Sequence, residues 1–220
     1  MPVGPVQAIA IHGDGRLVVR GAILLSRDAG KTWSDLTPGV PLQPEVLPGS
    51  RATQETTSYP VTSGVVTEQS ALLGAVSGVL RGAPSRPWTV ANLPSPVVAL
   101  GYDAGTVYAA TATTLFASRD DGQSFNAIAG GFGADSSLAI TSLGAARGEL
   151  LIIAKHVGPP ATDDLFRILH CHDGGKTWQI LSQEIEHMPT SSPAAGPGGW
   201  YVGLASDGVW FLPTPAPQTP

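Results

Sequence analysis

The chain has 220 residues, of which 42% are hydrophobic and 13% are charged, with 27 Gly and 20 Pro. This balance is typical of a turn-rich globular protein, and the apolar runs that recur along the whole length exclude a disordered chain. The formal net charge is −5 and the only lysines, Lys31, Lys155 and Lys176, lie far apart, so the dense basic stripe that a nucleic acid or an anionic membrane requires is absent.

The cellular compartment is predicted from the cysteine count and from the N-terminal segment. Cys171 is the single cysteine, which excludes an intrachain disulfide and fits a reducing compartment. The N-terminal segment lacks the basic and long apolar regions of a secretory signal, and no run of about 18 apolar residues could span a membrane. We therefore expect a cytoplasmic protein if the chain is complete, and a secreted one if a signal peptide was removed.

One motif recurs along the chain. Leu24–Trp33 reads LLSRDAGKTW, Phe116–Phe125 reads FASRDDGQSF and His170–Trp178 reads HCHDGGKTW. A weaker copy at Val79–Trp88, VLRGAPSRPW, keeps the apolar residues and the tryptophan but loses the aspartate, and Gly208–Leu212 matches only the apolar run before the motif. Equivalent first positions are 55, 37, 53 and 41 residues apart, close to the ~40–50 residues of a propeller blade.

In chain order, each repeat predicts a meander of short strands with the motif at the turn before the last strand. The first repeat predicts strands over residues 6–12, 16–21, 22–28 and 31–36, and the third and fourth repeats follow the same plan. In the second repeat the first strand falls somewhere within 56–66, and in the fifth somewhere within 184–196. The Pro-rich segments Pro38–Thr57 and Gln183–Gly199 are predicted to be long loops.

The inner strands of these repeats indicate burial on both faces. Runs such as Leu150–Ala154, LLIIA, are apolar at every position, as expected of a blade covered by a neighbour on each side. A helix over Ser137–Lys155 is the rival interpretation, but Gly144 and Gly148 interrupt it. We predict an all-β protein, a β-propeller of about five four-stranded antiparallel blades with the last incomplete.

The predicted organisation is a single propeller domain over residues 1–212, followed by a Pro-rich tail over 213–220. The repeats span approximately residues 7–37, 55–92, 96–128, 137–182 and 184–212. Since the fifth repeat lacks an outer strand, the chain forms either a small ring with a short fifth blade or an open arc. An open arc would expose its end blades, which predicts a possible homo-oligomer that covers them.

Each residue type in the motif has a structural task in a tight turn. The aspartate accepts hydrogen bonds from backbone N–H groups, the glycine adopts positive φ, the hydroxyls satisfy further turn groups, and the aromatic residue enters the next strand and packs between blades. The residues predicted to serve these structural tasks are Ser26, Asp28, Gly30, Thr32, Trp33, Ser118, Asp120, Gly122, Ser124, Phe125, Cys171, Asp173, Gly175, Thr177 and Trp178.

On these motifs, over residues 7–212, the chain resembles the Asp-box (BNR) repeat β-propellers. It is similar to the sialidase-like and the photosystem II assembly-factor-like propellers of that group. The resemblance implies that the motifs are structural and that they lie on the face away from the binding mouth. It does not choose between the catalytic and the non-catalytic members.

The sequence offers little support for catalysis. A sialidase-like hydrolase would need an arginine cluster, a Tyr–Glu pair and an Asp acid/base, and the scattered arginines form no such cluster. Paired carboxylates drawn from Glu68, Asp103 or Asp163 remain open, because no spacing singles them out. We therefore predict no catalytic residue and no cofactor.

A metal site is suggested by the run HCHD at residues 170–173. His170 and His172 would share one face of a strand and Cys171 would point to the other. A third ligand would have to come from elsewhere in the chain, and no CxxC or HxxxH spacing supplies one. We therefore predict no metal, and a small buried side chain at Cys171.

The predicted function is a non-catalytic binding or assembly scaffold for a protein or peptide partner. The alternative is a glycoside hydrolase or a lectin-like propeller that binds a glycan. Because the motifs are expected on the opposite face, the binding mouth would be lined by turns between second and third strands and by loops between blades. The candidate binding residues there are Arg20, His156, Asp163, Asp164 and Asp207.

Overall fold

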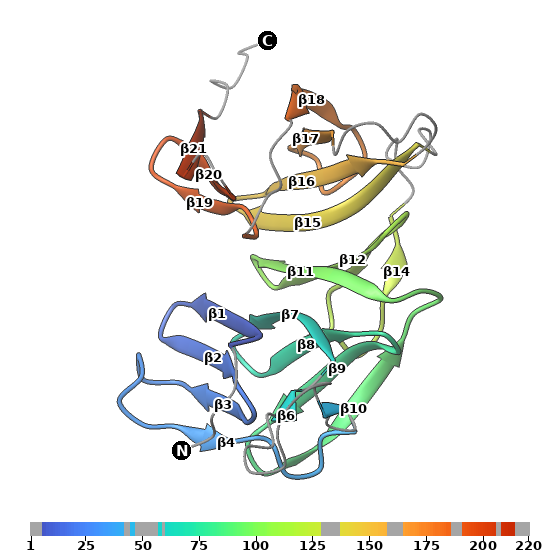
Figure 1. The fold of residues 1–220 in the computed structure, drawn as a ribbon. Helices are drawn as coiled ribbons and strands as arrows, with labels where there is room; N and C mark the ends of the chain where they lie inside the picture. The colour runs from blue at the N-terminus through green and yellow to red at the C-terminus, as the bar shows by residue number, and fades with distance from the viewer. Residues whose placement is uncertain are drawn as a thin grey trace. The chain divides into compact units, whose positions relative to one another are not determined.

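The computed structural model describes residues 6–41, 45–46, 57–58, 60–128, 137–157, 165–185, 191–205 and 208–213. All regular secondary structure within these ranges is β-strand (Figure 1). Five small antiparallel sheets follow one another along the chain as the blades of a β-propeller. The predicted fold class is therefore confirmed, and the helical alternative for Ser137–Lys155 is wrong, because that segment holds β15 (Leu138–Ala146) and most of β16 (Glu149–His156).

Four sheets have four strands each, and the fifth has three. The first sheet contains β1 (Ala8–His12), β2 (Gly15–Val19), β3 (Ile23–Ser26) and β4 (Ser34–Asp35). The second contains β7 (Val61–Val66), β8 (Ala71–Ala75), β9 (Gly78–Ala83) and β10 (Arg86–Asn92). The third contains β11 (Val97–Asp103), β12 (Thr106–Thr111), β13 (Leu115–Ser118) and β14 (Asn126–Ala127).

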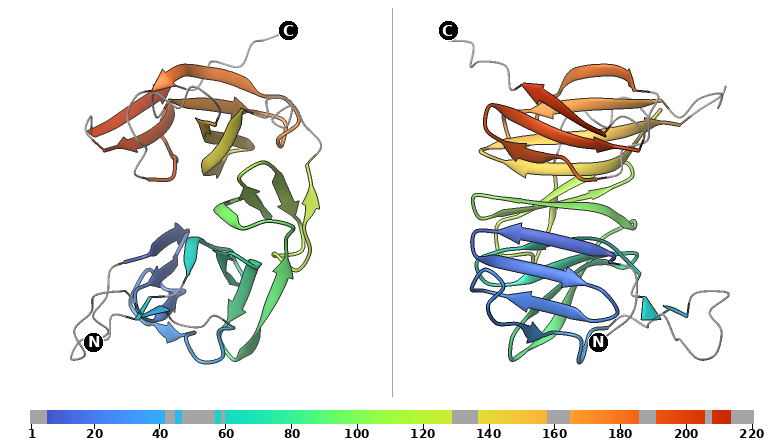
Figure 2. Two further views of the ribbon diagram at one scale, coloured as in Figure 1. Left: turned by 45° about the vertical axis from the view of Figure 1, so that its right-hand side comes forward. Right: turned by 60° about the vertical axis from the view of Figure 1, so that its left-hand side comes forward.

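The fourth sheet is formed by β15, β16, β17 (Phe166–Cys171) and β18 (Gln179–Ile185), and the fifth by β19 (Ala194–Gly196), β20 (Gly199–Leu204) and β21 (Gly208–Pro213). Strands that are consecutive in sequence pair as neighbours in every sheet, which makes each blade a simple meander (Figure 2). First-to-second-strand turns and third-to-fourth-strand turns consequently share one end of a blade, and second-to-third-strand turns lie at the other end.

The chain divides into two compact units. Unit 1 comprises Met1–Thr111 and Phe116–Asn126, and unit 2 comprises Ala112–Leu115 and Ala127–Pro220. Unit 1 contains the first two sheets and most of the third, and unit 2 contains the fourth and fifth. The single domain over residues 1–212 stays a prediction.

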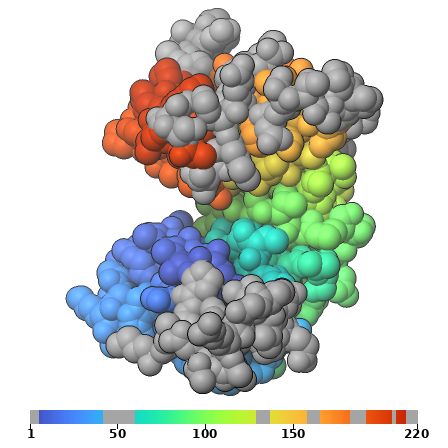
Figure 3. Space-filling model, in the orientation of Figure 1, coloured from blue at the N-terminus to red at the C-terminus, as the bar shows by residue number. Residues whose placement is uncertain are grey.

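Within each unit the apolar core lies between neighbouring sheets. One cluster joins the first and second sheets, with Leu17 and Leu25 packed among Leu73 and Leu80, and a further cluster joins the second and third sheets. Figure 3 shows the first sheet, in blue, directly beside the second, in cyan. In unit 2 the third cluster packs the fourth sheet against the fifth. All five residues of β8 are buried because sheets cover both of its faces, as the apolar runs indicate.

The first and fifth sheets differ from this pattern because each has an exposed apolar face. In β1, Ile9 and Ile11 are 63% and 66% exposed, while the alternating Ala8 and Ala10 pack on the core. In β21, Val209 and Phe211 are exposed in the same way.

The two predicted loops contain short strands. Within Pro38–Thr57, β5 (Glu45–Val46) pairs with β6 (Thr57–Ser58), which begins at the last residue of the predicted loop. Within Gln183–Gly199, β18 continues to Ile185 and β19 forms the first strand of the fifth sheet. β19 lies within residues 184–196, where the first strand of the fifth repeat was predicted. The loop predictions are wrong only for β5, for Thr57 of β6 and for the end of β18, since short strands next to a paired neighbour need no strong sequence pattern. In the described part of the chain no helix is long and apolar enough to cross a membrane.

Candidate functional site

The motif at Ser26–Trp33 forms a compact turn, called the box turn below, between β3 and β4. Ser26 Oγ donates to Asp28 Oδ1 at 2.8 Å and accepts from the Gly30 N–H at 2.8 Å. Thr32 donates twice to Asp28, from its N–H to Oδ1 at 2.8 Å and from its hydroxyl to Oδ2 at 2.6 Å. The aspartate thus ties both arms of the turn together.

The third and fourth blades build the same turn with the same contacts. Ser124 donates to both carboxylate oxygens of Asp120, at 3.0 and 2.6 Å, and Thr177 does so to Asp173, at 2.9 and 2.6 Å. In the fourth blade the thiol of Cys171 replaces the serine hydroxyl, and its Sγ lies 2.9 Å from Asp173 Oδ1.

Two consecutive residues of every box turn have positive φ. The glycines Gly30, Gly122 and Gly175 have φ of 92°, 79° and 97°. The residues before them, Ala29, Asp121 and Gly174, have φ of 58°, 60° and 71°. Only the glycines were predicted from the sequence, and the strain at Ala29 and Asp121 is a feature that the motif did not reveal.

The hydrogen bonds of the box turns stabilise ionised carboxylates. The hydroxyl and N–H of Thr32 lower the pKa of Asp28 to about 2. Burial works to raise the pKa of Asp120, but the hydrogen bonds from Ser124 and Ser118 outweigh it and lower the pKa to about 2. Burial raises the pKa of the Cys171 thiol, which keeps it protonated.

The tryptophan of the first box turn is not placed as predicted. Trp33 is 44% exposed and donates from Nε1 to the Gly30 carbonyl at 3.0 Å, so it closes its own turn instead of packing between blades. The inter-blade role is taken by Trp88 of the second blade, which has no box turn. Its ring lies over Gly82, where an added Cβ would come within 2.7 Å, and its Nε1 donates to the Leu36 carbonyl of the first blade at 2.8 Å.

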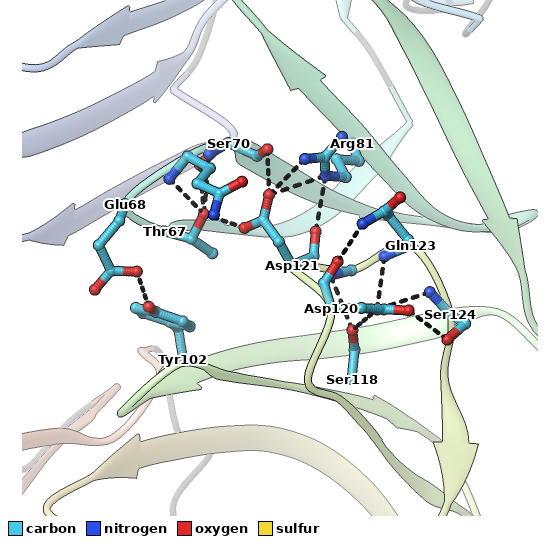
Figure 4. Close-up of polar contacts among 12 residues, drawn as sticks. Thr67, Glu68, Ser70, Arg81, Tyr102, Ser118, Asp120, Asp121, Gln123 and Ser124 are labelled. Atoms are coloured by element: carbon cyan, nitrogen blue, oxygen red, sulfur yellow. Dashed lines mark hydrogen bonds and ion pairs between the residues drawn. The ribbon is translucent and has the colours of Figure 1, made fainter.

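A largely buried ion pair joins the second blade to the third. Arg81 Nη2 lies 2.6 Å from Asp121 Oδ2, and the two side chains are 12% and 13% exposed (Figure 4). The hydroxyl of Ser70 donates to the same oxygen at 2.6 Å, and the Thr67 hydroxyl donates to Oδ1. Burial works to raise the pKa of Asp121, but these hydrogen bonds and the guanidinium hold it below its usual value. Thr67 also accepts a hydrogen bond from Arg27 of the first box turn through its carbonyl.

Next to this ion pair, a groove of about 350 Å³ opens at the end of the blades that carries the box turns. The residues that line it come from the turn between β7 and β8, from the end of β11 and the turn that follows, and from the box turn of the third blade. They are Glu68, Gln69, Tyr102, Gly105, Arg119, Asp120, Asp121 and Gln123. Figure 4 shows Glu68 and Tyr102 facing each other at one side and Asp120 and Gln123 at the other.

A Tyr–Glu pair stands at the edge of the groove. Tyr102 donates its phenolic hydrogen to Glu68, whose Oε1 also lies 3.3 Å from His12 Nε2. Burial raises the pKa of Tyr102 to about 12, and the bond to Glu68 adds to the effect. The same bond lowers the pKa of Glu68. The phenol is therefore a hydrogen-bond donor at neutral pH and a poor nucleophile.

The groove lies at the opposite end of the blades from the predicted binding mouth. Arg20 follows β2 in unit 1, at the second-to-third-strand end, and its side chain is exposed. His156 ends β16 in unit 2, where its N–H donates to the Leu165 carbonyl at 2.9 Å. Asp163, Asp164 and Asp207 lie outside the described residues. The predicted mouth therefore stays a prediction.

In unit 2 a carboxylate from a neighbouring strand meets the two histidines of the HCHD run. Glu149, the first residue of β16, lies against both of them. Its Oε2 is 3.2 Å from His170 Nε2, and its Oε1 is 3.4 Å from His172 Nδ1. Trp200 Nε1 donates to Glu149 Oε2 at 3.1 Å. His170 is fully buried, and burial lowers its pKa.

No family model matches the chain, and no curated protein matches it. Solved structures do resemble it. YCF48 from Cyanidioschyzon merolae superposes with a TM-score of 0.55 at 15% identity, over 96% of this chain and 67% of YCF48. The Dos1 propeller superposes with a TM-score of 0.61 at 10% identity, over 96% of this chain and 58% of the other.

The extracellular domain of BT4673 from B. thetaiotaomicron gives a TM-score of 0.55 at 16% identity, and this chain spans only 27% of its length. Likeness at these identities shows the fold alone. The chain is therefore a β-propeller protein, and it corresponds in length to a part of each of these structures.

Proposed function

We propose that this propeller is a non-catalytic scaffold that captures a peptide segment carrying a carboxylate in the groove of unit 1. The observation that carries the proposal is the lining of that groove, in which one exposed guanidinium, that of Arg119, stands beside rigidly held acceptors and donors. Arg119 makes no hydrogen bond or ion pair with any residue that the structure describes, whereas Asp120 and Asp121 are already bound within their own networks.

The size and the support of the groove fit a short extended segment. Its volume of about 350 Å³ lies at the lower end of the range for ligand pockets, ~300–1,000 Å³. The exposed amides of Gln69 and Gln123 can bond to a peptide backbone, and the ring of Tyr102 offers an apolar wall. Because the box turn and the Arg81–Asp121 pair hold these walls, little ordering entropy would be lost on binding.

One observation favours the alternative, a glycoside hydrolase, namely the Tyr102–Glu68 pair at the groove edge. Two observations oppose it. The raised pKa of Tyr102 keeps the phenol protonated. Arg119 is the one arginine among the residues that line the groove, and the nearby Arg81 is already bound to Asp121. An arginine cluster for a sugar carboxylate is therefore missing from this groove. We expect no hydrolysis of sialosides or aryl glycosides above a no-protein control.

We further propose that the three box turns make this chain an Asp-box type of propeller. The hydrogen bonds from Ser26 and Thr32 to Asp28, and their equivalents in the third and fourth blades, support this assignment. On this proposal the turns are structural, and their role in the groove is to hold its wall in place.

The peptide proposal is tested with an array of immobilised peptides, followed by fluorescence polarisation with the peptides that bind. Arg119→Glu should weaken binding of acidic peptides by at least about tenfold, since a charge pair becomes a repulsion. Arg20→Glu is the matched control, because it makes the same charge change at the opposite end of the blades. Loss of binding in Arg20→Glu but not in Arg119→Glu would favour the predicted mouth. An array without any bound peptide would contradict the proposed function.

A further inference from the structure

The cluster of Glu149, His170 and His172 in unit 2 has the composition and spacing of a metal site. The three residues each offer one ligand atom, and these atoms lie within 4.8 Å of one another. His170 Nε2 lies 3.2 Å from Glu149 Oε2 and His172 Nδ1 lies 3.4 Å from Glu149 Oε1. Each distance is close to the roughly 3.3 Å between ligand atoms around a tetrahedral zinc ion at bond lengths near 2.0–2.2 Å, and small side-chain movements would bring one oxygen and both nitrogens to that spacing. We propose that Glu149, His170 and His172 bind one Zn²⁺ ion, with a water molecule as the fourth ligand.

The strand register explains how these residues meet. His170 and His172 are two apart along the chain, so their side chains share one face, and their rings lie 4.1 Å apart between centroids. Leu150 pairs with Cys171, so the next position along each strand sets Glu149 opposite His172. Cys171 points to the other face, where it bonds to Asp173, and its thiol takes no part in the cluster.

Comparison among the repeats shows that packing does not require these three residues. The position of His170, just before the first box residue, is Leu25, Leu80 and Ala117 in the first three blades. At the position equivalent to His172, the first three blades have Arg27, Gly82 and Arg119. At the position equivalent to Glu149, they have Gly15, Ala71 and Thr106. The fourth blade therefore has three zinc-ligating side chains at equivalent positions where the first three blades have none.

The buried histidine is the second feature that packing leaves unexplained. His170 is fully buried, and its Nδ1 has no hydrogen-bond partner among the described residues. An apolar residue, as in the first three blades, would fill this position without an unsatisfied nitrogen.

The surroundings of the cluster hold the carboxylate and leave a path to solvent. Trp200 is buried and its indole N–H orients Glu149, as outer hydrogen bonds do for metal-binding carboxylates. The ring lies against Gly144, where an added Cβ would come within 2.6 Å of it, so the indole has little freedom. The side chain of His172 is 46% exposed, which lets an ion enter and a water molecule complete the coordination.

The test is a titration of the chelator-stripped full chain with Zn²⁺, followed by isothermal calorimetry and by metal analysis after dialysis. The wild type should bind one Zn²⁺ per chain. His172→Ala and Glu149→Gln should each weaken binding by roughly 100-fold, at least as much as outer-shell changes do. Because His172 is half exposed, His172→Ala should keep the melting temperature of the metal-free protein, which separates lost binding from lost folding.

Two controls make the assignment specific. His12 is about as exposed as His172 and also lies beside a glutamate, Glu68, but no second histidine lies beside this pair among the described residues. The His12→Ala variant should therefore bind Zn²⁺ as the wild type does. Cys171→Ser should also leave binding unchanged, and bound Co²⁺ should show no thiolate charge-transfer band. The proposal is overturned if the wild type fails to bind Zn²⁺ stoichiometrically, if both ligand variants bind like the wild type, or if His12→Ala loses binding to the same extent.

Discussion

The third and fourth blades build one turn with the same hydrogen bonds and place different chemistry beside it. In both turns an aspartate accepts two hydrogen bonds from the hydroxy residue four positions later. Beside the box turn of the third blade lies an Arg–Asp pair that links two blades. Beside the box turn of the fourth blade lies a Glu–His–His cluster within that blade. The turn is therefore a common support, and the residues next to it differ in chemistry from one blade to the other.

The largest effect is expected from breaking the ion pair of the third blade. Arg81→Ala should lower the free energy of unfolding by about 3 kcal/mol, because it leaves the Asp121 carboxylate largely buried without its cation. Urea unfolding of Arg81→Ala, Asp121→Ala and the double variant measures the coupling, for which we expect about 1–3 kcal/mol. Additive effects of the two single changes would show that the pair does not join the blades.

The next effect concerns the glycines of the two turns. Gly122→Ala should cost about 2 kcal/mol, because the added Cβ would lie 2.1 Å from Leu72 Cδ2 at a position with φ of 79°. Gly175→Ala should cost less, since its nearest contact would be 3.1 Å. Gly105→Ala is the matched control, with φ of 80° and open space around it, and isolates the backbone strain. Equal losses in all three variants, measured by thermal unfolding, would contradict a packing role for Gly122.

A smaller effect is expected from the carboxylates of the turns. Asp120→Asn should lower the melting temperature by roughly 3–8 °C at neutral pH, through the hydrogen bonds it weakens. The folded-state pKa of Asp120, about 2, lies below the usual unfolded value of about 3.9, so its contribution is present above pH 4 and is lost as pH falls toward 2. Melting curves between pH 2 and 6 should therefore converge for wild type and variant at the acid end. A gap of constant size would show that ionisation does not matter there.

The smallest effect should come from the atom that distinguishes the fourth turn. Cys171→Ser places in this blade the hydroxyl that Ser26 and Ser118 supply in the others, with the same two partners. The free energy of unfolding should change by about 1 kcal/mol or less. A loss much larger than this would mean that the thiol has a packing role that the hydroxyl cannot replace.

The features of this protein that depend on local interactions could be predicted from the amino-acid sequence. The inner strands follow from apolar runs, and the box turns follow from contacts that reach at most four residues along the chain, such as Thr32 to Asp28. A residue pattern can reveal contacts of that length because the chain brings the atoms together without any help from the rest of the fold.

Which distant side chains meet could not be predicted in this way, because it depends on the tertiary structure. Arg81 and Asp121 are 40 residues apart, and Glu149 and His170 are 21 apart, so no local spacing connects them. The stacking of sheets in unit 1 formed the groove at the end of the blades that holds the box turns, and strand register brought Glu149 to the histidines. These placements depend on packing between strands and sheets, which is a property of the whole unit and is not written in any one segment.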